Sequence, residues 1–221
     1  MPLWKAAQGP EPDLTDTAAS SVRTRKPKGE GHSRRAEILA AAERIFVEHG
    51  YEGATIRKIA DEVGLSSTAL YMHFADKGEI LQEICRGAFE TLTEATGHIV
   101  ADQAPPEQRL RSMIEGYVRF GFENPNAYRL VYMTRPLEAR DAQTAAQEVG
   151  LSLFAAFQQV VDETAAAGRL RAEPRAAAQA LWAGGHGVVS LMITKPYFDW
   201  VDREQLTRTL LDALFDGLLT P

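Results

Sequence analysis

Small polar and aromatic side chains follow one another closely between residues 55 and 77, and their spacing suits contacts with nucleic acid. Ser66 is a good helix N-cap, and the two-turn helix predicted after it begins with the hydroxyl groups of Ser67 and Thr68. Tyr71 falls on the outward side of the same helix. Side chains of this kind hydrogen-bond to base edges and phosphate oxygens. The segment is therefore typical of a helix that reads the major groove of DNA.

A second short helix must hold this reading helix in place. It is expected to follow Thr55, another good N-cap, and to end at Gly64, where a left-handed turn leads into the next helix. The small Ala60 fits the point where the two helices cross. Leu70 and Phe74 mark the inner face of the reading helix. Two short helices joined by a tight turn indicate a helix-turn-helix unit.

Charge is distributed unevenly along the chain. The 221 residues carry a formal net charge of −6 at pH 7. Residues 23–35 nevertheless contain six Arg or Lys side chains, Arg34 among them, and one Glu, whereas residues 81–221 hold 13 basic and 18 acidic groups. A basic arm on an acidic body is typical of nucleic-acid binding. A solvated tail without a partner is the alternative that composition leaves open.

The remaining sequence predicts an all-α fold of about nine helices. From Ser33 onward apolar residues recur with a helical period, and alternating strand patterns are missing. Residues 1–32 have no period and are rich in Pro, Gly, Ser and charge, so a disordered basic arm is expected there. A helix-turn-helix domain is expected over 33–80, and a second helical domain over 81–221. The helices are expected at about 33–49, after Thr55, after Ser66, from Asp76 to about 100, and at about 107–123, 126–133, 138–167, 175–195 and 202–219.

The sequence offers no catalytic or metal-binding constellation. Its single cysteine, Cys85, excludes an internal disulfide, suits a reducing compartment and sits among apolar neighbours as a small buried side chain would. Metal-site spacings and the nucleophile, phosphate-loop and dinucleotide motifs are missing, so we expect no metal, no cofactor and no enzyme activity. No signal-peptide core and no apolar run of roughly 20 residues is present. A cytoplasmic protein without membrane contact is expected.

Residues 33–80 resemble the TetR/AcrR family of bacterial transcriptional regulators. The combination of motifs is highly specific, although each motif alone is weak. The matching pattern is Ile38-Leu39-x2-Ala42-x3-Phe46-x3-Gly50-Tyr51, then Thr55-x3-Ile59-Ala60-x3-Gly64-Leu65-Ser66, then Leu70-Tyr71-x-His73-Phe74-x2-Lys77. The resemblance implies a three-helix DNA-binding domain on a larger helical domain that binds a ligand and forms a dimer.

The resemblance also implies roles for individual residues in binding double-stranded DNA. Thr55 would bond a phosphate beside the positive end of its helix, and Lys77 would bind another. Tyr71 and His73 match an aromatic pair that contacts backbone phosphates, and arginines such as Arg34 would enter the minor groove or add counterion release. The residues that would meet bases or phosphates at the start of the reading helix are Ser66, Ser67 and Thr68. Structural alternatives stay open, since Thr55 and Ser66 are also good helix caps.

The C-terminal part carries a weaker resemblance. The pattern Trp182-x3-His186-Gly187 looks like the signature of one C-terminal subtype of the family. Aromatic and Met side chains are frequent here, which suits a cavity for a small apolar or aromatic effector. Ordinary core packing is the alternative for each of them. The expected ligand-binding residues are Tyr117, Phe120, Tyr132, Phe154, Trp182 and His186, of which Tyr117, Tyr132 and His186 would orient the ligand.

The last two helices are expected to form a homodimer interface. Leucines at 206, 210, 214 and 218 make one apolar stripe, and Gly184, Gly185 and Gly187 would allow another helix to approach closely. A dimer would also place two reading helices about 34–36 Å apart, as a palindromic site requires.

Together these patterns predict a cytoplasmic regulator of transcription, most simply a repressor released from a palindromic operator by a small apolar or aromatic molecule. The fourth helix would move on ligand binding, and efflux or catabolic genes are the expected targets. One alternative is a helical small-molecule-binding protein or enzyme without specific DNA binding. Another is a DNA-binding protein without an effector.

Overall fold

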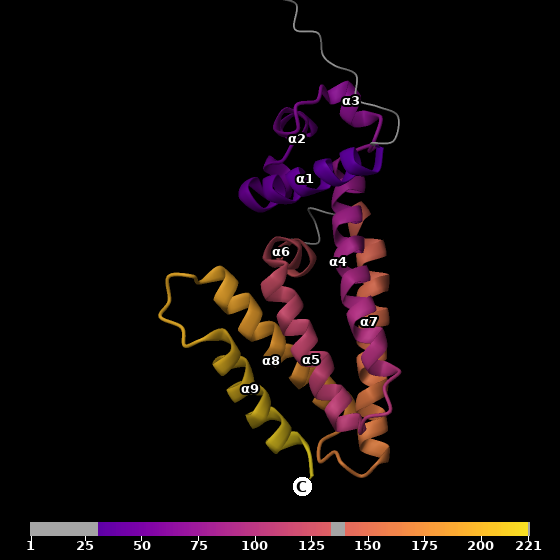
Figure 1. Ribbon diagram of the computed structural model, residues 1–221, viewed down its shortest axis with the longest axis vertical. Helices are drawn as coiled ribbons and strands as arrows, with labels where there is room; N and C mark the ends of the chain where they lie inside the picture. The colour runs from indigo at the N-terminus through magenta and orange to yellow at the C-terminus, as the bar shows by residue number, and fades with distance from the viewer. Residues whose placement is uncertain (1–30, 134–139, 221) are drawn as a thin grey trace, which may run out of the picture.

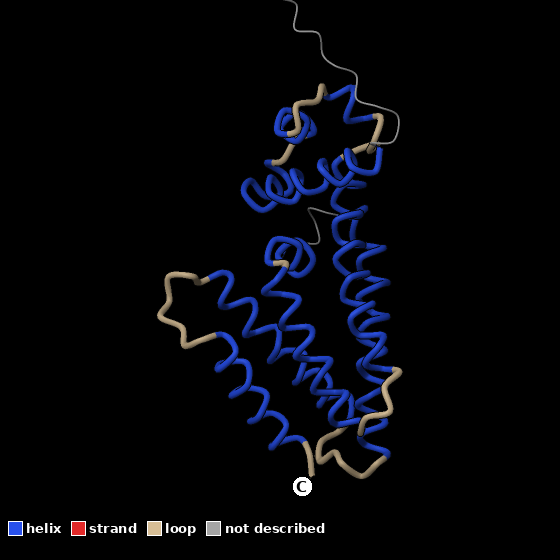
Figure 2. Tube along the Cα trace, in the orientation of Figure 1, coloured by secondary structure: helices blue, strands red, loops and turns tan. Residues whose placement is uncertain are grey.

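The computed structural model describes residues 31–133 and 140–220, and within these ranges the protein is a stack of α-helices without a named strand (Figures 1 and 2). The predicted all-α class and the approximate helix positions are confirmed. The helices are α1 (Gly31–Gly53), α2 (Ile56–Glu62), α3 (Ser67–Tyr71), α4 (Lys77–Val100), α5 (Pro106–Glu123), α6 (Pro125–Met133), α7 (Arg140–Ala166), α8 (Pro174–Thr194) and α9 (Arg203–Leu218). The expected arm at 1–32 lies almost wholly outside the described residues.

Polar caps and two glycines fix where the first helices begin and end. Ser66 Oγ accepts a hydrogen bond from the Ala69 amide, and an Asp76 carboxylate oxygen accepts one from the Glu79 amide. Gly64 has φ +67°, and Gly50 has φ +69° within the span of α1. Both are left-handed conformations that favour glycine. The regular part of α1 therefore ends at Gly50, and a tight turn separates α2 from α3.

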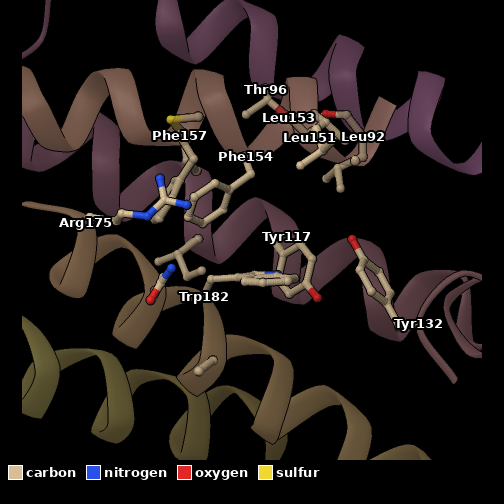
Figure 3. Close-up of a pocket in the computed structure, with 15 residues that line it drawn as sticks. Leu92, Thr96, Tyr117, Tyr132, Leu151, Leu153, Phe154, Phe157, Arg175 and Trp182 are labelled. Carbon is tan, nitrogen blue, oxygen red and sulfur yellow. Dashed lines mark hydrogen bonds between the residues drawn. The ribbon is translucent and has the colours of Figure 1, made fainter. Parts of the chain in front are cut away.

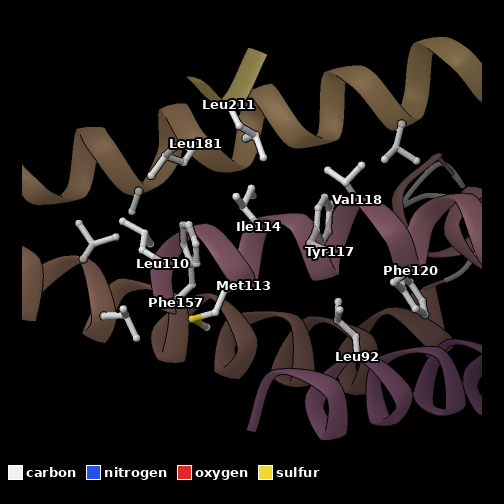
Figure 4. Close-up of a cluster of buried hydrophobic side chains, with 14 of the residues drawn as sticks. Leu92, Leu110, Met113, Ile114, Tyr117, Val118, Phe120, Phe157, Leu181 and Leu211 are labelled. Carbon is white, nitrogen blue, oxygen red and sulfur yellow. The ribbon is translucent and has the colours of Figure 1, made fainter. Parts of the chain in front are cut away.

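The helices enclose two hydrophobic cores. Helices α1–α3 gather at one end of the molecule, and the long α4 runs from them along α7 into the bundle of α5, α8 and α9 (Figure 1). The core at the α1–α3 end is built around the fully buried Ile38, Ile59 and Leu70. The bundle core includes Leu110, Leu181 and Leu211 (Figure 4). The chain thus has a small N-terminal domain and a larger helical domain that share α4.

Two of the three α8 glycines pack within one chain. A Cβ at Gly184 would lie 2.8 Å from Leu214 Cδ1 of α9, and a Cβ at Gly185 would lie 3.1 Å from Ile114 Cδ1 of α5. These two positions permit close packing of α8 on α9 and α5, so the close approach of another helix expected from the sequence occurs within the chain. Gly187 has no such neighbour within 4 Å. The half-buried leucine stripe of α9 likewise faces α8 of its own chain through Leu210 and Leu214.

The helix α8 is unusually apolar for its degree of burial. Among the described residues it is the one helix long and apolar enough to cross a membrane. In its most apolar stretch, 33% of the residues are buried in the protein. It packs on α5, α7 and α9, as a core helix of a helical bundle does. Part of α8 stays exposed in the single chain, including Leu191, which is 49% exposed and lies outside the cavity lining.

Gly121→Ala tests how tightly α5 is packed. A methyl group there would lie 2.5 Å from Val189 Cγ1 and 3.0 Å from Tyr128 Cδ2, and both side chains are fully buried. We expect the free energy of unfolding to fall by about 1–3 kcal/mol, as for other overpacked cores. Urea denaturation followed by circular dichroism measures the change. The matched control is Gly97→Ala in α4, where no such atom lies within 4 Å and a gain of about 0.5–1 kcal/mol is expected. Equal losses in both variants would contradict the packing described.

Candidate DNA-binding surface and effector cavity

The outer face of α3 presents large side chains to solvent. Tyr71 is 54% exposed and the adjacent Met72 is 83% exposed, and Thr68 is exposed one turn earlier. The inner side of the same segment is anchored by the buried Leu70 and Phe74. Apolar groups left exposed on a helix this well anchored are available to a partner surface. The geometry suits insertion of α3 into a groove.

Two of the predicted DNA-binding residues cap helices. Thr55 Oγ accepts a hydrogen bond from the Lys58 amide 3.2 Å away, and Ser66 Oγ accepts one from the Ala69 amide. A hydroxyl that accepts one hydrogen bond still has a proton to donate. Both residues are exposed and Ser67 is half-buried. Their capping role is therefore compatible with a contact to a phosphate oxygen.

Two other predicted DNA-binding residues, Lys77 and Arg34, have side-chain partners within the protein, and a third, His73, is partly buried. Lys77 Nζ donates to the carbonyl oxygen of Tyr51 at 2.8 Å and lies 4.2 Å from the centre of the Tyr51 ring. Arg34 pairs with Glu37 at 2.6 Å. His73 is half-buried and lies at the end of the turn that follows α3. In this structure Lys77 ties the start of α4 to the C-terminal end of α1.

Sequence reasoning missed Arg35, whose guanidinium links three parts of the N-terminal domain. It pairs with Glu83 at 2.5 Å and with Glu79 at 3.4 Å, both on α4. It also donates to the backbone carbonyl of His73 and stacks 4.0 Å from the centre of the Phe74 ring. The hydrogen bond from Arg35 lowers the pKa of the Glu83 carboxyl. Because one side chain joins α1, α4 and the end of the reading helix, Arg35 holds α3 in position. Its neighbour Arg34 has the same type and local charge, so the sequence offered no signal to separate them.

The short helix α6 belongs to both cores. Tyr128 is fully buried in the core of the larger domain, whereas Leu130 is buried in the core of the N-terminal domain. The helix packs on α1, α4 and α5, and in Figure 1 it lies between the N-terminal helices and the bundle. The carboxyl group of Glu43 on α1 also interacts with the backbone of Ala127 at the start of α6. A displacement of α6 therefore disturbs both domains.

The larger domain contains a cavity of about 800 Å³ (Figure 3). Helices α4–α8 all contribute to it, and its surface is mainly apolar. A volume of this size holds a drug-sized molecule. The lining residues are Leu92, Thr96, Met113, Ile114, Tyr117, Tyr132, Gly150, Leu151, Leu153, Phe154, Phe157, Arg175, Gln179, Trp182 and Ala183. Four of the six residues expected to bind a ligand are among them, namely Tyr117, Tyr132, Phe154 and Trp182.

The other two expected ligand-binding residues lie outside the lining. Phe120 is buried in the core of the larger domain. His186 stands behind the wall, where its Nδ1 lies 2.6 Å from the hydroxyl of Tyr128 and 3.4 Å from that of Tyr117. Phe120 lies three residues after Tyr117, and His186 lies four residues after Trp182. This spacing does not show which residue of each pair lines the cavity and which lies outside the lining.

The tyrosine hydroxyls next to His186 form an uncharged network. Burial raises the pKa values of Tyr117, Tyr128 and Tyr132, and burial lowers that of His186. All four groups are therefore neutral near pH 7. The Tyr128 hydroxyl shares one hydrogen bond with Nδ1 of the neutral imidazole at 2.6 Å and another with the Tyr117 hydroxyl at 3.0 Å. Tyr128, which the sequence analysis did not single out, joins the cavity wall to α6 and α8.

Other parts of the described chain bear on the exclusions made from the sequence. Cys85 is buried, and burial raises the pKa of its thiol to about 11. The expectation of a small, buried cysteine side chain is confirmed. No cluster of three or more metal-ligating side chains occurs in the parts of the chain that the structure describes.

Sequence comparison assigns both domains to one family. Residues 38–84 match the profile described as bacterial regulatory proteins of the tetR family, and residues 110–214 match the profile described as a tetracyclin repressor-like C-terminal domain. The chain belongs to the TetR family. The resemblance found in the helix-turn-helix motifs is therefore confirmed, and it extends into the C-terminal part.

Named relatives are regulators of transcription. The chain is 31% identical over 125 residues to the transcriptional activator FasR of Mycolicibacterium smegmatis, covering 55% of this chain and 57% of FasR. It is 40% identical over 85 residues to the transcriptional repressor KstR2 of Mycobacterium tuberculosis, covering 38% of this chain and 42% of KstR2. The chain thus matches 57% of the length of FasR and 42% of the length of KstR2. This TetR-family protein contains the DNA-binding domain of bacterial regulatory proteins, and the named relatives are transcriptional regulators.

Solved structures share the whole fold. KstR2 of Mycobacterium tuberculosis superposes with a TM-score of 0.70 at 22% identity, covering 85% of this chain and 96% of that one. A TetR-family transcription regulator from Marinobacter aquaeolei superposes with a TM-score of 0.68 at 20% identity, covering 86% and 97%. At these identities the comparison supports the fold, with its N-terminal helix-turn-helix and C-terminal helical domain.

Arg35→Gln tests whether this TetR-family regulator uses Arg35 to position α3. We expect the affinity for specific DNA to fall about tenfold, because the reading helix loses its tie to α4, while the slope of log affinity against log salt stays unchanged. A direct phosphate contact would instead reduce that slope by about 1. Fluorescence anisotropy over a range of salt concentrations measures both quantities.

Arg44→Gln is the matched control for this substitution. Arg44 also lies on α1, and it forms a more exposed ion pair with Glu62 at 3.0 Å. Its loss should change DNA affinity little. Equal effects of the two substitutions, or a reduced salt slope for Arg35→Gln, would contradict the positioning role.

Proposed function

We propose that this regulator is a ligand-responsive repressor that binds a palindromic operator as a homodimer and leaves it when a small molecule fills the cavity. The observation that carries the proposal is that α6 contributes buried residues to the cores of both domains. Tyr132 lines the cavity, and Leu130 of the same helix lies in the N-terminal core. A ligand that displaces the wall at Tyr132 acts directly on the domain that holds α3. Ligand and operator then weaken each other's binding by the same factor.

Contacts with double-stranded DNA are assigned to α3 and its surroundings. Tyr71 and Thr68 are the exposed residues of the reading helix, and Thr55 and Ser66 place hydroxyls beside the first turns of α2 and α3. Lys77 and Arg34 are the charged candidates for phosphate contacts, and each would have to exchange a present partner for a phosphate. Ser67 and His73 complete the proposed set.

Homodimerisation through α8 and α9 is supported by the part of α8 that stays exposed. Within one chain, only 33% of the most apolar stretch of α8 is buried. Leu191, near the C-terminal end of this helix, is 49% exposed. Covering such a surface with a second copy removes apolar surface from water. The same arrangement would bring two α3 helices to the spacing of about 34–36 Å that successive major grooves require.

The direction of regulation, the genes controlled and the subtype are further parts of the proposal. FasR is named an activator, whereas KstR2 is named a repressor. Repression is favoured here because it follows directly from a ligand that disrupts operator binding. Efflux or catabolic genes suit an apolar effector, and the cytoplasm is where such a regulator meets DNA. The Trp182-x3-His186-Gly187 pattern supports the C-terminal subtype suggested by the sequence.

Selection of genomic fragments by the purified protein, followed by footprinting at two salt concentrations, tests the operator. We expect a two-fold symmetric site with half-sites one helical turn apart, and a loss of about tenfold or more in affinity for Tyr71→Ala. The matched control is Tyr197→Ala, which removes a tyrosine that is 79% exposed on the α8–α9 connection. Its operator affinity should match that of the unchanged protein. Binding that is indifferent to sequence, or an asymmetric footprint of a single half-site, would refute the proposal.

A further inference from the structure

The cavity has two polar ends of different character. In Figure 3 Arg175 stands at one end and Tyr132 at the other, with Phe154, Trp182 and Tyr117 between them. Arg175, Gln179 and Trp182 are spaced four and three residues apart, so they share one face of α8. At a rise of 1.5 Å per residue, the positions of Arg175 and Trp182 are separated by about 10 Å along the helix. The cavity therefore extends at least this far along α8 from Arg175, and its lining between the two ends is mainly apolar.

Arg175 is the one charged side chain among the lining residues that the structure describes. The nearest acidic group in the sequence is Glu173, and it is occupied at the start of α8. Its carboxylate oxygens accept hydrogen bonds from the backbone amides of Arg175 and Ala176 at 3.0 and 2.7 Å. These bonds, which lower the pKa of Glu173, cap the helix. Among the side chains that the structure describes, none accepts a hydrogen bond from the Arg175 guanidinium, so its five N–H donors can bind an anion at the cavity mouth.

The opposite end of the cavity offers neutral hydroxyl groups. Tyr117 and Tyr132 lie on its wall and are backed by Tyr128 and the neutral His186. Such groups suit a hydroxyl or carbonyl oxygen, and no charged lining residue there would balance a charge on the ligand. The middle of the cavity is walled by the aromatic pair Phe154 and Trp182, whose ring centres lie 5.6 Å apart. This part suits an alkyl chain or a flat ring.

From this arrangement we infer that the effector is an elongated amphipathic anion. Its carboxylate or phosphate pairs with Arg175, its apolar body lies along Phe154 and Trp182, and a neutral oxygen at its far end bonds the hydroxyl of Tyr132. The inference deepens the proposed function and rests on it, since it names the class of molecule that fills the same cavity. A guanidinium pairs with carboxylate and phosphate through the same bidentate geometry.

Isothermal titration calorimetry with matched probes tests the inference. The probes are 12-hydroxydodecanoate, 12-hydroxydodecyl phosphate and the neutral methyl 12-hydroxydodecanoate, together with 4′-hydroxybiphenyl-4-carboxylate and its methyl ester. We expect an anion to bind about tenfold more tightly than the ester of the same body, as one charge-assisted hydrogen-bonded pair at a partly exposed site provides. The tighter of the two dodecyl anions shows whether the site prefers carboxylate or phosphate.

Substitutions on two helices make the test specific. Arg175→Gln should abolish the preference for the anion and leave the affinity for the ester unchanged. The matched control is Arg119→Gln, which removes the same charge from an exposed position on α5 outside the cavity lining. It should keep the preference. An anion preference that survives Arg175→Gln, or equal affinities of anion and ester for the unchanged protein, would overturn the inference.

Operator release by the same probes separates the two proposals. If the esters bind and release the operator as well as the anions do, the regulator is ligand-responsive and the inferred anion site is wrong. If the anions bind through Arg175 without affecting the operator, the site is correct and the proposed response is wrong. Failure of every probe to bind at 1 mM, roughly the weak end of specific affinity, would refute the inferred class while leaving operator recognition to its own test.

Discussion

The arrangement of the whole molecule depends on the burial of α6 on both sides. Within three positions along this short helix, Tyr128 is fully buried in one core and Leu130 is 6% exposed in the other. Protein cores are packed as densely as organic crystals, so a buried helix cannot shift without displacing what it touches on each side. The neutral hydrogen-bonded group of Tyr117, Tyr128 and His186 fixes the bundle side of α6. The cavity therefore has a direct mechanical connection to the DNA-binding domain, and a ligand needs only different affinities for the two arrangements to shift between them.

The N-terminal domain is in turn held together by charged side chains that reach across helices. Arg35 connects α1 to two carboxylates of α4 and to the backbone at the end of the reading helix. Lys77 connects the start of α4 to one carbonyl oxygen in the last turn of α1 and to one just after this helix. Through these contacts, the position of α4 is coupled to the helices of the helix-turn-helix unit, α2 and α3. The helix α4 also borders the cavity through Leu92 and Thr96. Because α4 and α6 pack on each other, the movement predicted for α4 and the displacement proposed for α6 would occur together.

Local signals in the sequence predicted the helices and where they begin and end. Caps such as Thr55 and Ser66, and the left-handed Gly50 and Gly64, determine helix ends through interactions within a few residues. Roles that depend on tertiary neighbours escaped prediction. Arg34 and Arg35 are adjacent and chemically identical, and α4 alone decides that Arg35 becomes the link. Similarly, Trp182 and His186 share a helix face in the sequence pattern. In the folded protein Trp182 lines the cavity, whereas His186 lies behind the lining and contacts the hydroxyl groups of Tyr117 and Tyr128.

Hydrogen exchange of the protein with and without its operator tests most directly whether α6 couples the two domains. If the two cores are coupled through this helix, operator binding will slow exchange of backbone amides in α6, residues 125–133, as well as in α1–α3, because local opening of α6 disturbs both cores. The amides of α9, which packs on α8 and α5 and supplies no residue to the N-terminal core, should exchange at an unchanged rate within each dimer. Protection confined to α1–α3, with exchange in α6 unaffected, would contradict the account.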